Sequence, residues 1–183
     1  ERARHYTEDL AIPAAAAQLV ELTMDEFGGI DIVINNAAIL RDDFLFKANP
    51  DDWDTVIRNN LSAPFYLLRA TTPILRDQAK NKRGVDGHDG IYSWGRIVNI
   101  ISTVAFFGNY GQASYASSKG GLATLTRIAA IDMVMTTGVS GCNRRQATWT
   151  ATANAAKEIR NPLNRATRAF ARAPAETTAI LNA

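Results

Sequence analysis

Residues 13–35 read PAAAAQLVELTMDEFGGIDIVIN, and this stretch decides the fold class. Its first part places Leu19, Val20 and Met24 on one face of a helix, and two glycines follow where a helix C-cap is expected. Residues 31–35 then form a short, apolar, β-branched run, which is typical of a buried strand in a parallel sheet. A helix that leads through a tight glycine turn into a buried strand predicts an α/β fold.

The segments downstream continue this alternation of helix and strand. They predict, in order, a helix from Asn49 with a bend at Pro64, a surface loop over residues 79–95, a strand over residues 96–101 and a helix over residues 114–135. Short strands that alternate with helices predict a doubly wound parallel sheet.

The periodic signal fades after residue 136, and no strand is expected there. We therefore predict a structured core over residues 1–135 and an irregular tail, rich in Ala, Arg and Thr, over residues 136–183. Residues 143–183 hold seven Lys and Arg against two Asp and Glu, whereas residues 1–142 hold 13 against 16. Because the tail offers basic residues scattered among Ala and Thr, rather than a basic stripe with interleaved aromatic residues on a recognisable module, we expect no nucleic-acid partner.

The composition is that of a globular chain, with 46% hydrophobic and 21% charged residues. No apolar run approaches the ~20 residues that a membrane span needs, so no membrane partner is expected. The chain has a single cysteine, Cys142, which excludes an internal disulfide. A lone cysteine fits a reducing compartment and so predicts a cytoplasmic location. The simplest interpretation of its side chain is a small, buried, apolar residue. No spacing of His, Cys and Asp suggests a metal site.

Tyr115 and Lys119 are four residues apart and therefore share one face of the predicted third helix. An ammonium group beside a phenol favours the phenolate and lowers the tyrosine pKa from about 10 toward neutrality. Such a phenol can act as a general acid or base near pH 7. With five Tyr and five Lys in the chain, chance alone gives about 0.14 such pairs, so the spacing needs support from its context.

Ser102 supplies that context, because it ends the strand over residues 96–101 at the edge where doubly wound sheets bind ligands. Its hydroxyl can hydrogen-bond a substrate carbonyl; without Tyr115, a turn serine would be the simpler interpretation. Asn60 lies near the apolar face of the second helix, where a packing role and a relay role are equally open. Residues 35–38, Asn-Asn-Ala-Ala, close the first strand at the same edge, and their small side chains let a flat ligand approach the backbone.

Four segments of the chain together resemble the short-chain dehydrogenase/reductase family: DIVINNAA, IRNNLSAPF, IVNIIS and YASSK. The resemblance covers roughly residues 8–135. It places a catalytic tetrad at Asn60, Ser102, Tyr115 and Lys119. The fold it implies is a partial doubly wound Rossmann-type parallel sheet with helices on both faces and with the N-terminal strands missing. The stretches AILRDDFLFK and FGNYGQASYASSKGG are most similar to 3-oxoacyl-carrier-protein reductases and to hydroxyacyl-CoA dehydrogenase modules.

The resemblance implies an NAD(P)-dependent oxidoreductase that interconverts a secondary alcohol and a ketone, with a 3-hydroxyacyl or 3-oxoacyl thioester as a candidate substrate. In such an enzyme Tyr115 exchanges the substrate proton, Ser102 polarises the carbonyl, and Asn60 positions a water molecule. Lys119 lowers the pKa of the phenol and holds the nicotinamide ribose.

The resemblance also implies an NAD or NADP site and a homo-oligomer. Residues expected to bind the cofactor are Asn36, Ala37, Ala38, Tyr115 and Lys119. The helices that begin near Asn49 and Ser114 are expected to pair across a two-fold axis into a homodimer or homotetramer. The third helix is apolar on more than one face, which agrees with a buried partner surface.

The chain departs from the family pattern at both ends. The family's TGxxxGxG turn, whose backbone cradles the cofactor pyrophosphate, is not in the sequence, so about the first third of the fold is expected to be missing. After Met135, GVSGCNRRQATWT stands where the family has a Gly-x-x-Val-Asn-x-x-x-Pro-Gly segment, which suggests a frameshift or a faulty gene model. The alternative function is therefore a truncated, non-catalytic relative that keeps only packing and oligomerisation surfaces.

Overall fold

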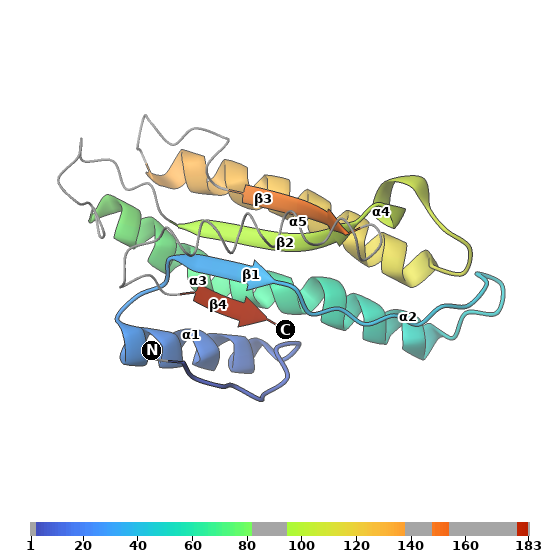
Figure 1. The fold of residues 1–183 in the computed structure, drawn as a ribbon, viewed down its shortest axis with the longest axis horizontal. Coiled ribbons are helices and arrows are strands. Elements are labelled where there is room, and N and C mark those ends of the chain that lie inside the picture. Colours follow the sequence, from blue (N-terminus) through green and yellow to red (C-terminus); the bar gives the residue numbers. More distant parts are fainter. Residues whose placement is uncertain (1–2, 82–94, 138–147, 154–178, 183) are drawn as a thin grey trace.

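The computed structural model of the chain describes residues 3–81, 95–137, 148–153 and 179–182. Its elements follow the chain in this order (Figure 1): α1 Pro13–Phe27, β1 Ile32–Asn35, α2 Pro50–Ile57, the π-helix η1 Arg58–Ser62, α3 Ala63–Lys80, β2 Arg96–Ser102, α4 Val104–Phe107, α5 Ala113–Thr137, β3 Thr148–Ala153 and β4 Ala179–Asn182. Most of the loop predicted over residues 79–95 lies outside the described residues.

The four strands form one parallel sheet in the order β3-β2-β1-β4. The predicted strands β1 and β2 pair directly, with Val33 opposite Ile97 and Asn35 opposite Asn99. The expectation of no strand after residue 136 is wrong, because β3 pairs with β2 and β4 pairs with β1. Hydrophobic periodicity missed these strands since both are short and one reads TWTATA, in which small and polar residues dominate. The predicted division of the chain into a core over residues 1–135 and a tail over residues 136–183 stays a prediction.

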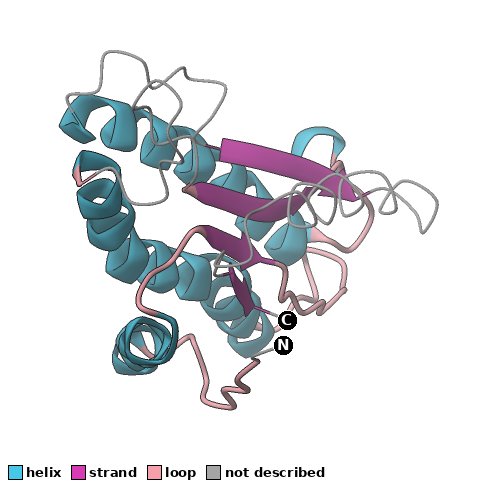
Figure 2. Ribbon diagram, turned by 60° about the vertical axis from the view of Figure 1, so that its left-hand side comes forward, coloured by secondary structure: helices cyan, strands magenta, loops and turns pink. Residues whose placement is uncertain are grey.

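The three long helices α1, α3 and α5 pack on one face of the sheet (Figure 2). Val33 and Ile97 point to this face and belong to the same buried cluster as Val20 of α1 and Leu67 of α3. Leu125 of α5 packs against that cluster. Helices were expected on both faces, and none of the long helices in the described ranges covers the other one.

Local sequence explains where α1 begins and ends and where α2 begins. Pro13 occupies the first turn of α1, and Gly28 ends this helix at φ 74°, a left-handed conformation in which its N–H bonds the Met24 carbonyl. Asn49 caps α2, since its side chain accepts a hydrogen bond of 2.9 Å from the Asp51 N–H. The end of α1 at Gly28 and the start of α2 at Asn49 both agree with the prediction from sequence.

The second predicted helix is divided by a π-helix that ends just before Pro64. The π-helix η1 separates α2 from α3, and the Ala63 N–H bonds the Arg58 carbonyl five residues back. Pro64 has no N–H to give to the carbonyl of Asn60, so the ordinary helical bond cannot form there, and the wider turn lies just ahead of it. One consequence is that Asn60, in the middle of η1, is fully buried.

No helix in the described ranges is long and apolar enough to cross a membrane.

Candidate active site

The candidate site lies where β1 and β2 end and α5 begins. Ser102, the last residue of β2, is buried, and its hydroxyl oxygen lies 3.4 Å from the Val104 N–H as acceptor. The Ser102 side chain also lies close enough to the phenol of Tyr115, in the first turn of α5, to lower the pKa of that phenol by hydrogen bonding. The structure therefore brings together the serine and the tyrosine, which are thirteen residues apart in the sequence.

Lys119 lies beneath the ring of Tyr115, with its Nζ 5.8 Å from the ring centroid. The lysine is only 2% exposed, and its ammonium donates a hydrogen bond of 2.7 Å to the Ile100 carbonyl of β2. Because burial disfavours the charged form, the pKa of Lys119 is lowered from 10.5 to about 8. The expected proximity of the phenol and the ammonium is thus present.

The pKa of Tyr115 moves in the direction opposite to the sequence prediction. Burial raises this pKa above 10 and is the main cause; the hydrogen bond from Ser102 lowers it, and the negative charge of Asp42 raises it further. The spacing of residues along the helix indicated the lysine but neither the burial of the ring nor the influence of the Asp42 charge. In this structure, then, Tyr115 is held in its protonated form.

Asn60 connects three segments of the site. Its side-chain amide donates to the Ile39 carbonyl at 2.9 Å, and its Oδ1 accepts from the Ile39 N–H at 2.8 Å, so it holds both backbone groups of that residue. The amide also contacts the Ser118 hydroxyl at 3.3 Å, and Ser118 in turn donates to the Tyr115 carbonyl at 2.8 Å. These bonds support a positioning role for Asn60; its role in holding a water molecule stays a prediction.

Asn60→Ala is expected to lower the free energy of unfolding by about 2–3 kcal/mol, because it leaves both backbone groups of Ile39 without their partner. Urea unfolding of the purified chain measures this change. Asn59→Ala is the matched control, since the Asn59 side chain bonds only the Thr55 carbonyl of its own helical turn, and it should cost less than about 0.5 kcal/mol. Equal losses in the two variants would contradict the positioning role.

The residues expected to bind the cofactor follow β1 at the same edge of the sheet. Asn36 and Ala38 are exposed, and Ala37 is partly buried. Just before them, the Asn35 amide donates to Asn99 Oδ1 at 2.7 Å, and the Asn99 amide donates to the Thr126 hydroxyl at 2.8 Å. This buried polar chain ties β1 and β2 to α5. Neither Asn99 nor Thr126 was among the site residues predicted from the sequence, although an amide in the middle of a buried strand was a signal for such a network.

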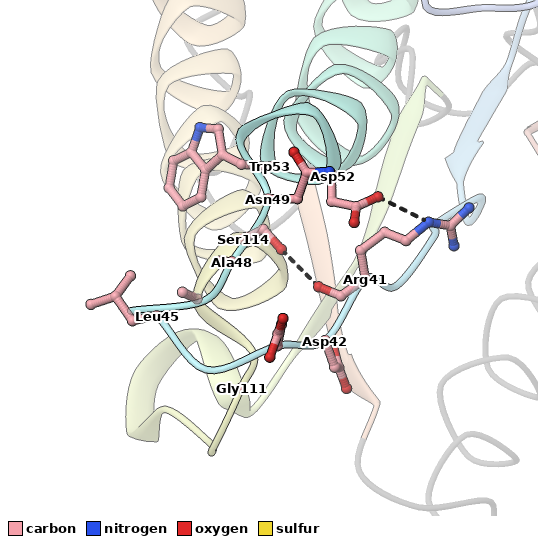
Figure 3. A pocket seen from close by; sticks show the side chains of 11 residues that line it. Arg41, Asp42, Leu45, Ala48, Asn49, Asp52, Trp53, Gly111 and Ser114 are labelled. Atoms are coloured by element: carbon pink, nitrogen blue, oxygen red, sulfur yellow. Dashed lines mark hydrogen bonds and ion pairs between the residues drawn. The ribbon is translucent and has the colours of Figure 1, made fainter.

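A separate pocket of about 150 Å³ lies beside the site (Figure 3). Its walls come from residues 41–53 and 111–114, and none of the four tetrad residues lines it. An ion pair of 3.5 Å between Arg41 and Asp52 crosses its rim. Within the described part of the chain, no group of three or more His, Cys, Asp or Glu side chains could hold a metal ion.

Comparison with known proteins identifies the family. A family model of short chain dehydrogenases matches residues 1–161 of the chain. The chain belongs to the short-chain dehydrogenase family. Short-chain dehydrogenases among the solved structures include a crystal structure from Mycobacterium avium, which matches with a TM-score of 0.61 and 32% sequence identity over 70% of this chain and 42% of that one.

Two curated relatives of this short-chain dehydrogenase carry more specific descriptions. The 3-oxoacyl-[acyl-carrier-protein] reductase FabG of Vibrio cholerae is 35% identical over 115 residues, which make up 63% of this chain and 41% of that protein. The hydroxyacyl-CoA dehydrogenase ChsB1 of Mycobacterium tuberculosis is 38% identical over 122 residues, 67% of this chain and 36% of that protein. The chain therefore spans well under half the length of these relatives.

Proposed function

We propose that the complete protein is an NAD(P)-dependent oxidoreductase that interconverts a secondary alcohol and a ketone. The observation that carries this proposal is the convergence of Ser102, Tyr115 and Lys119 at the edge of the sheet, with the Ser102 side chain close enough to the phenol to influence its pKa and the lysine beneath its ring. Family membership and the two curated relatives support it. By analogy with those relatives, the substrate is a 3-oxoacyl or 3-hydroxyacyl thioester.

The residues divide the work of ketone reduction among them. The hydroxyls of Ser102 and Tyr115 are adjacent and both can donate, so together they can hold and polarise one carbonyl oxygen. The chemistry that a reduced nicotinamide would supply, when bound, is hydride for the carbonyl carbon. Tyr115 gives its proton to the carbonyl oxygen, which completes the alcohol and leaves a phenolate. The Lys119 ammonium, 5.8 Å from the ring, is placed to stabilise that phenolate.

The chain fits the nicotinamide end of an NAD(P) cofactor better than it fits the pyrophosphate. Asn36 and Ala38 are exposed just after β1, and Lys119 lies beneath the ring of Tyr115. No glycine-rich TGxxxGxG turn stands in the sequence to cradle a pyrophosphate. For the 183 residues alone, the alternative of a non-catalytic relative that keeps packing surfaces therefore stands beside the proposal. A cytoplasmic location and the choice between NAD and NADP stay predictions.

An activity assay of the complete protein tests the proposal. We expect it to oxidise NADH or NADPH in the presence of a short 3-oxoacyl thioester, followed by cofactor absorbance. A simple ketone without a thioester serves as the control for substrate class, and it should react more slowly. No turnover with either cofactor on either substrate would contradict the oxidoreductase assignment.

We further propose that the complete protein is a homodimer or homotetramer joined through α3 and α5. Phe65 on α3 and Ile128 and Ile131 on α5 are 45%, 49% and 53% exposed, which is high for large apolar side chains. Light scattering at micromolar concentration should show an oligomer, and Ile131→Glu should weaken it by placing a charge in the apolar surface. Ile12→Glu is the control, because Ile12 is similarly exposed at the start of α1. A monomeric complete protein would contradict this proposal.

A further inference from the structure

Helix α5 is fastened to strand β2 by two polar contacts on one side of the helix. Lys119 donates to the Ile100 carbonyl at 2.7 Å. Thr126, seven residues further along α5, accepts from the Asn99 amide at 2.8 Å. Because seven residues make about two turns of an α-helix, both side chains leave α5 on the same side. Figure 1 shows α5 lying along β2, so the two contacts together fix where the helix lies on the strand.

The contact at Thr126 belongs to a buried hydrogen-bond chain that crosses two strands. The Asn35 amide of β1 donates to Asn99 Oδ1 at 2.7 Å, and the Asn99 amide donates in turn to Thr126. The Thr126 hydroxyl then donates to the Leu122 carbonyl at 2.7 Å. The three side chains are at most 2% exposed. Each buried donor therefore depends on the acceptor that the protein supplies, since an unpaired buried group loses its bonds to water without replacement.

This hydrogen-bond chain is closed at α5 and open at β1. Asn35 Oδ1 is buried and accepts no hydrogen bond within the described part of the protein. The Thr126 hydroxyl, by contrast, is bonded as an acceptor and as a donor. Without this hydroxyl the Asn99 amide would be unpaired between sheet and helix. Turning both asparagine amides over would only leave Asn99 Oδ1 unpaired instead, so Thr126 is the anchor of the chain.

We propose that Thr126 is a positioning residue: through Asn99 it holds α5 against β2, and so keeps the Lys119 ammonium in its buried place. An unpaired amide between strand and helix is relieved when the helix moves outward and water enters. Because Lys119 lies on the same side of α5, this movement would also loosen its bond to the Ile100 carbonyl. The effect on Lys119 concerns the chain itself, whereas its consequence for turnover rests on the proposed function.

Titration of Lys119 in the 183-residue chain tests the proposal. The chain is labelled with lysine carrying ¹³C at Cε, and the Lys119 resonance is assigned by its absence in Lys119→Met. Burial is the cause that lowers the pKa of Lys119 to about 8, so the titration midpoint reports whether water reaches the ammonium. Thr126→Val removes the hydroxyl and keeps the shape of the side chain, whereas Thr126→Ser keeps the hydroxyl.

Thr71→Val is the matched control. Thr71 is 0% exposed, and its hydroxyl donates to the carbonyl four residues back, as that of Thr126 does. In the described part of the protein, both hydrogen bonds of the Thr71 hydroxyl stay within α3, to the carbonyls of Leu67 and Leu68. This variant therefore loses a buried hydroxyl of the same kind but leaves the link between α5 and β2 intact.

We expect Thr126→Val to raise the Lys119 midpoint by about one pH unit or more, from about 8 toward 10.5. Thr126→Ser and Thr71→Val should leave the midpoint within about 0.3 pH units of wild type. A general loss of stability would act in Thr126→Val and Thr71→Val alike, so the difference between them isolates the positioning role. In the complete protein, Thr126→Val should lower kcat by roughly ten- to a hundredfold, and Thr126→Ser should restore it.

An unchanged midpoint in Thr126→Val, or the same shift in Thr71→Val, would overturn the proposal. If Thr126→Val does not fold, Thr126→Cys takes its place, because a thiol is a weak acceptor for the Asn99 amide. The midpoint should then rise in the same direction, and an unchanged midpoint in that variant would overturn the proposal as well. Because the titration needs neither substrate nor cofactor, its result is independent of whether the oxidoreductase activity is found.

Discussion

Tyr115→Phe is expected to lower the kcat of the complete protein by about 10²- to 10⁴-fold, the range typical of a lost general acid. The substitution removes only the hydroxyl, which is the group whose pKa Ser102 influences and which would give a proton to the substrate oxygen. The ring that lies over Lys119 is retained. Because the loss concerns a proton moved in the transition state, kcat should fall more than the apparent affinity for the cofactor changes.

Steady-state assays with saturating cofactor, together with a cofactor titration, measure the two effects separately. Tyr110→Phe provides the control: Tyr110 lies in the turn before α5 but is 89% exposed, so its loss should leave kcat within about twofold. If Tyr115→Phe retained its turnover, another group would have to supply the proton. If both variants lost activity equally, the cause would be distortion of the turn rather than loss of the acid.

The parts of the site that could be predicted from sequence are those carried by local spacing. Tyr115 and Lys119 share a helix face whatever surrounds them. Ser102 ends a strand that is predicted by the apolar, β-branched run of residues before it. The same holds for α1, whose apolar face and terminal glycine are both local signals. Such features follow from periodicity, and the structure has them where they were expected.

The parts that could not be predicted depend on contacts between distant segments. The negative charge of Asp42 is one of the causes that raise the Tyr115 pKa, and the hydrogen bond between Asp42 and Gln112 joins residues 70 positions apart in the chain. Asn60 binds Ile39, 21 residues earlier, across the site. Neither partner is visible in a local pattern, so the prediction for the tyrosine pKa counted the lysine and missed both burial and the carboxylate. The strand β4 is a similar case, since it pairs with β1, which lies far earlier in the chain.

Burial of Lys119 gives the chain a characteristic dependence of stability on pH. An ordinary lysine in the unfolded chain has a pKa of 10.5, and burial lowers the pKa of Lys119 in the folded chain to about 8. Between these values the unfolded state binds more protons than the folded state, so the free energy of unfolding rises with pH. Below about pH 8 the folded chain carries the full cost of a buried ammonium, on the order of 3 kcal/mol.

We therefore expect the free energy of unfolding to increase by about 2 kcal/mol between roughly pH 7 and pH 9.5 on account of this one residue. Urea unfolding at the two pH values measures the increase, and the comparison stays below pH 10 because the raised pKa of Tyr115 gives the opposite slope above it. Lys119→Met keeps a long, flexible side chain without the titrating group, so this variant should lose the increase. Lys80→Met, at the exposed end of α3, should retain it. If wild type and Lys119→Met showed the same slope, the Lys119 ammonium would have to be hydrated in solution, and the position of the lysine beneath the Tyr115 ring would need another explanation.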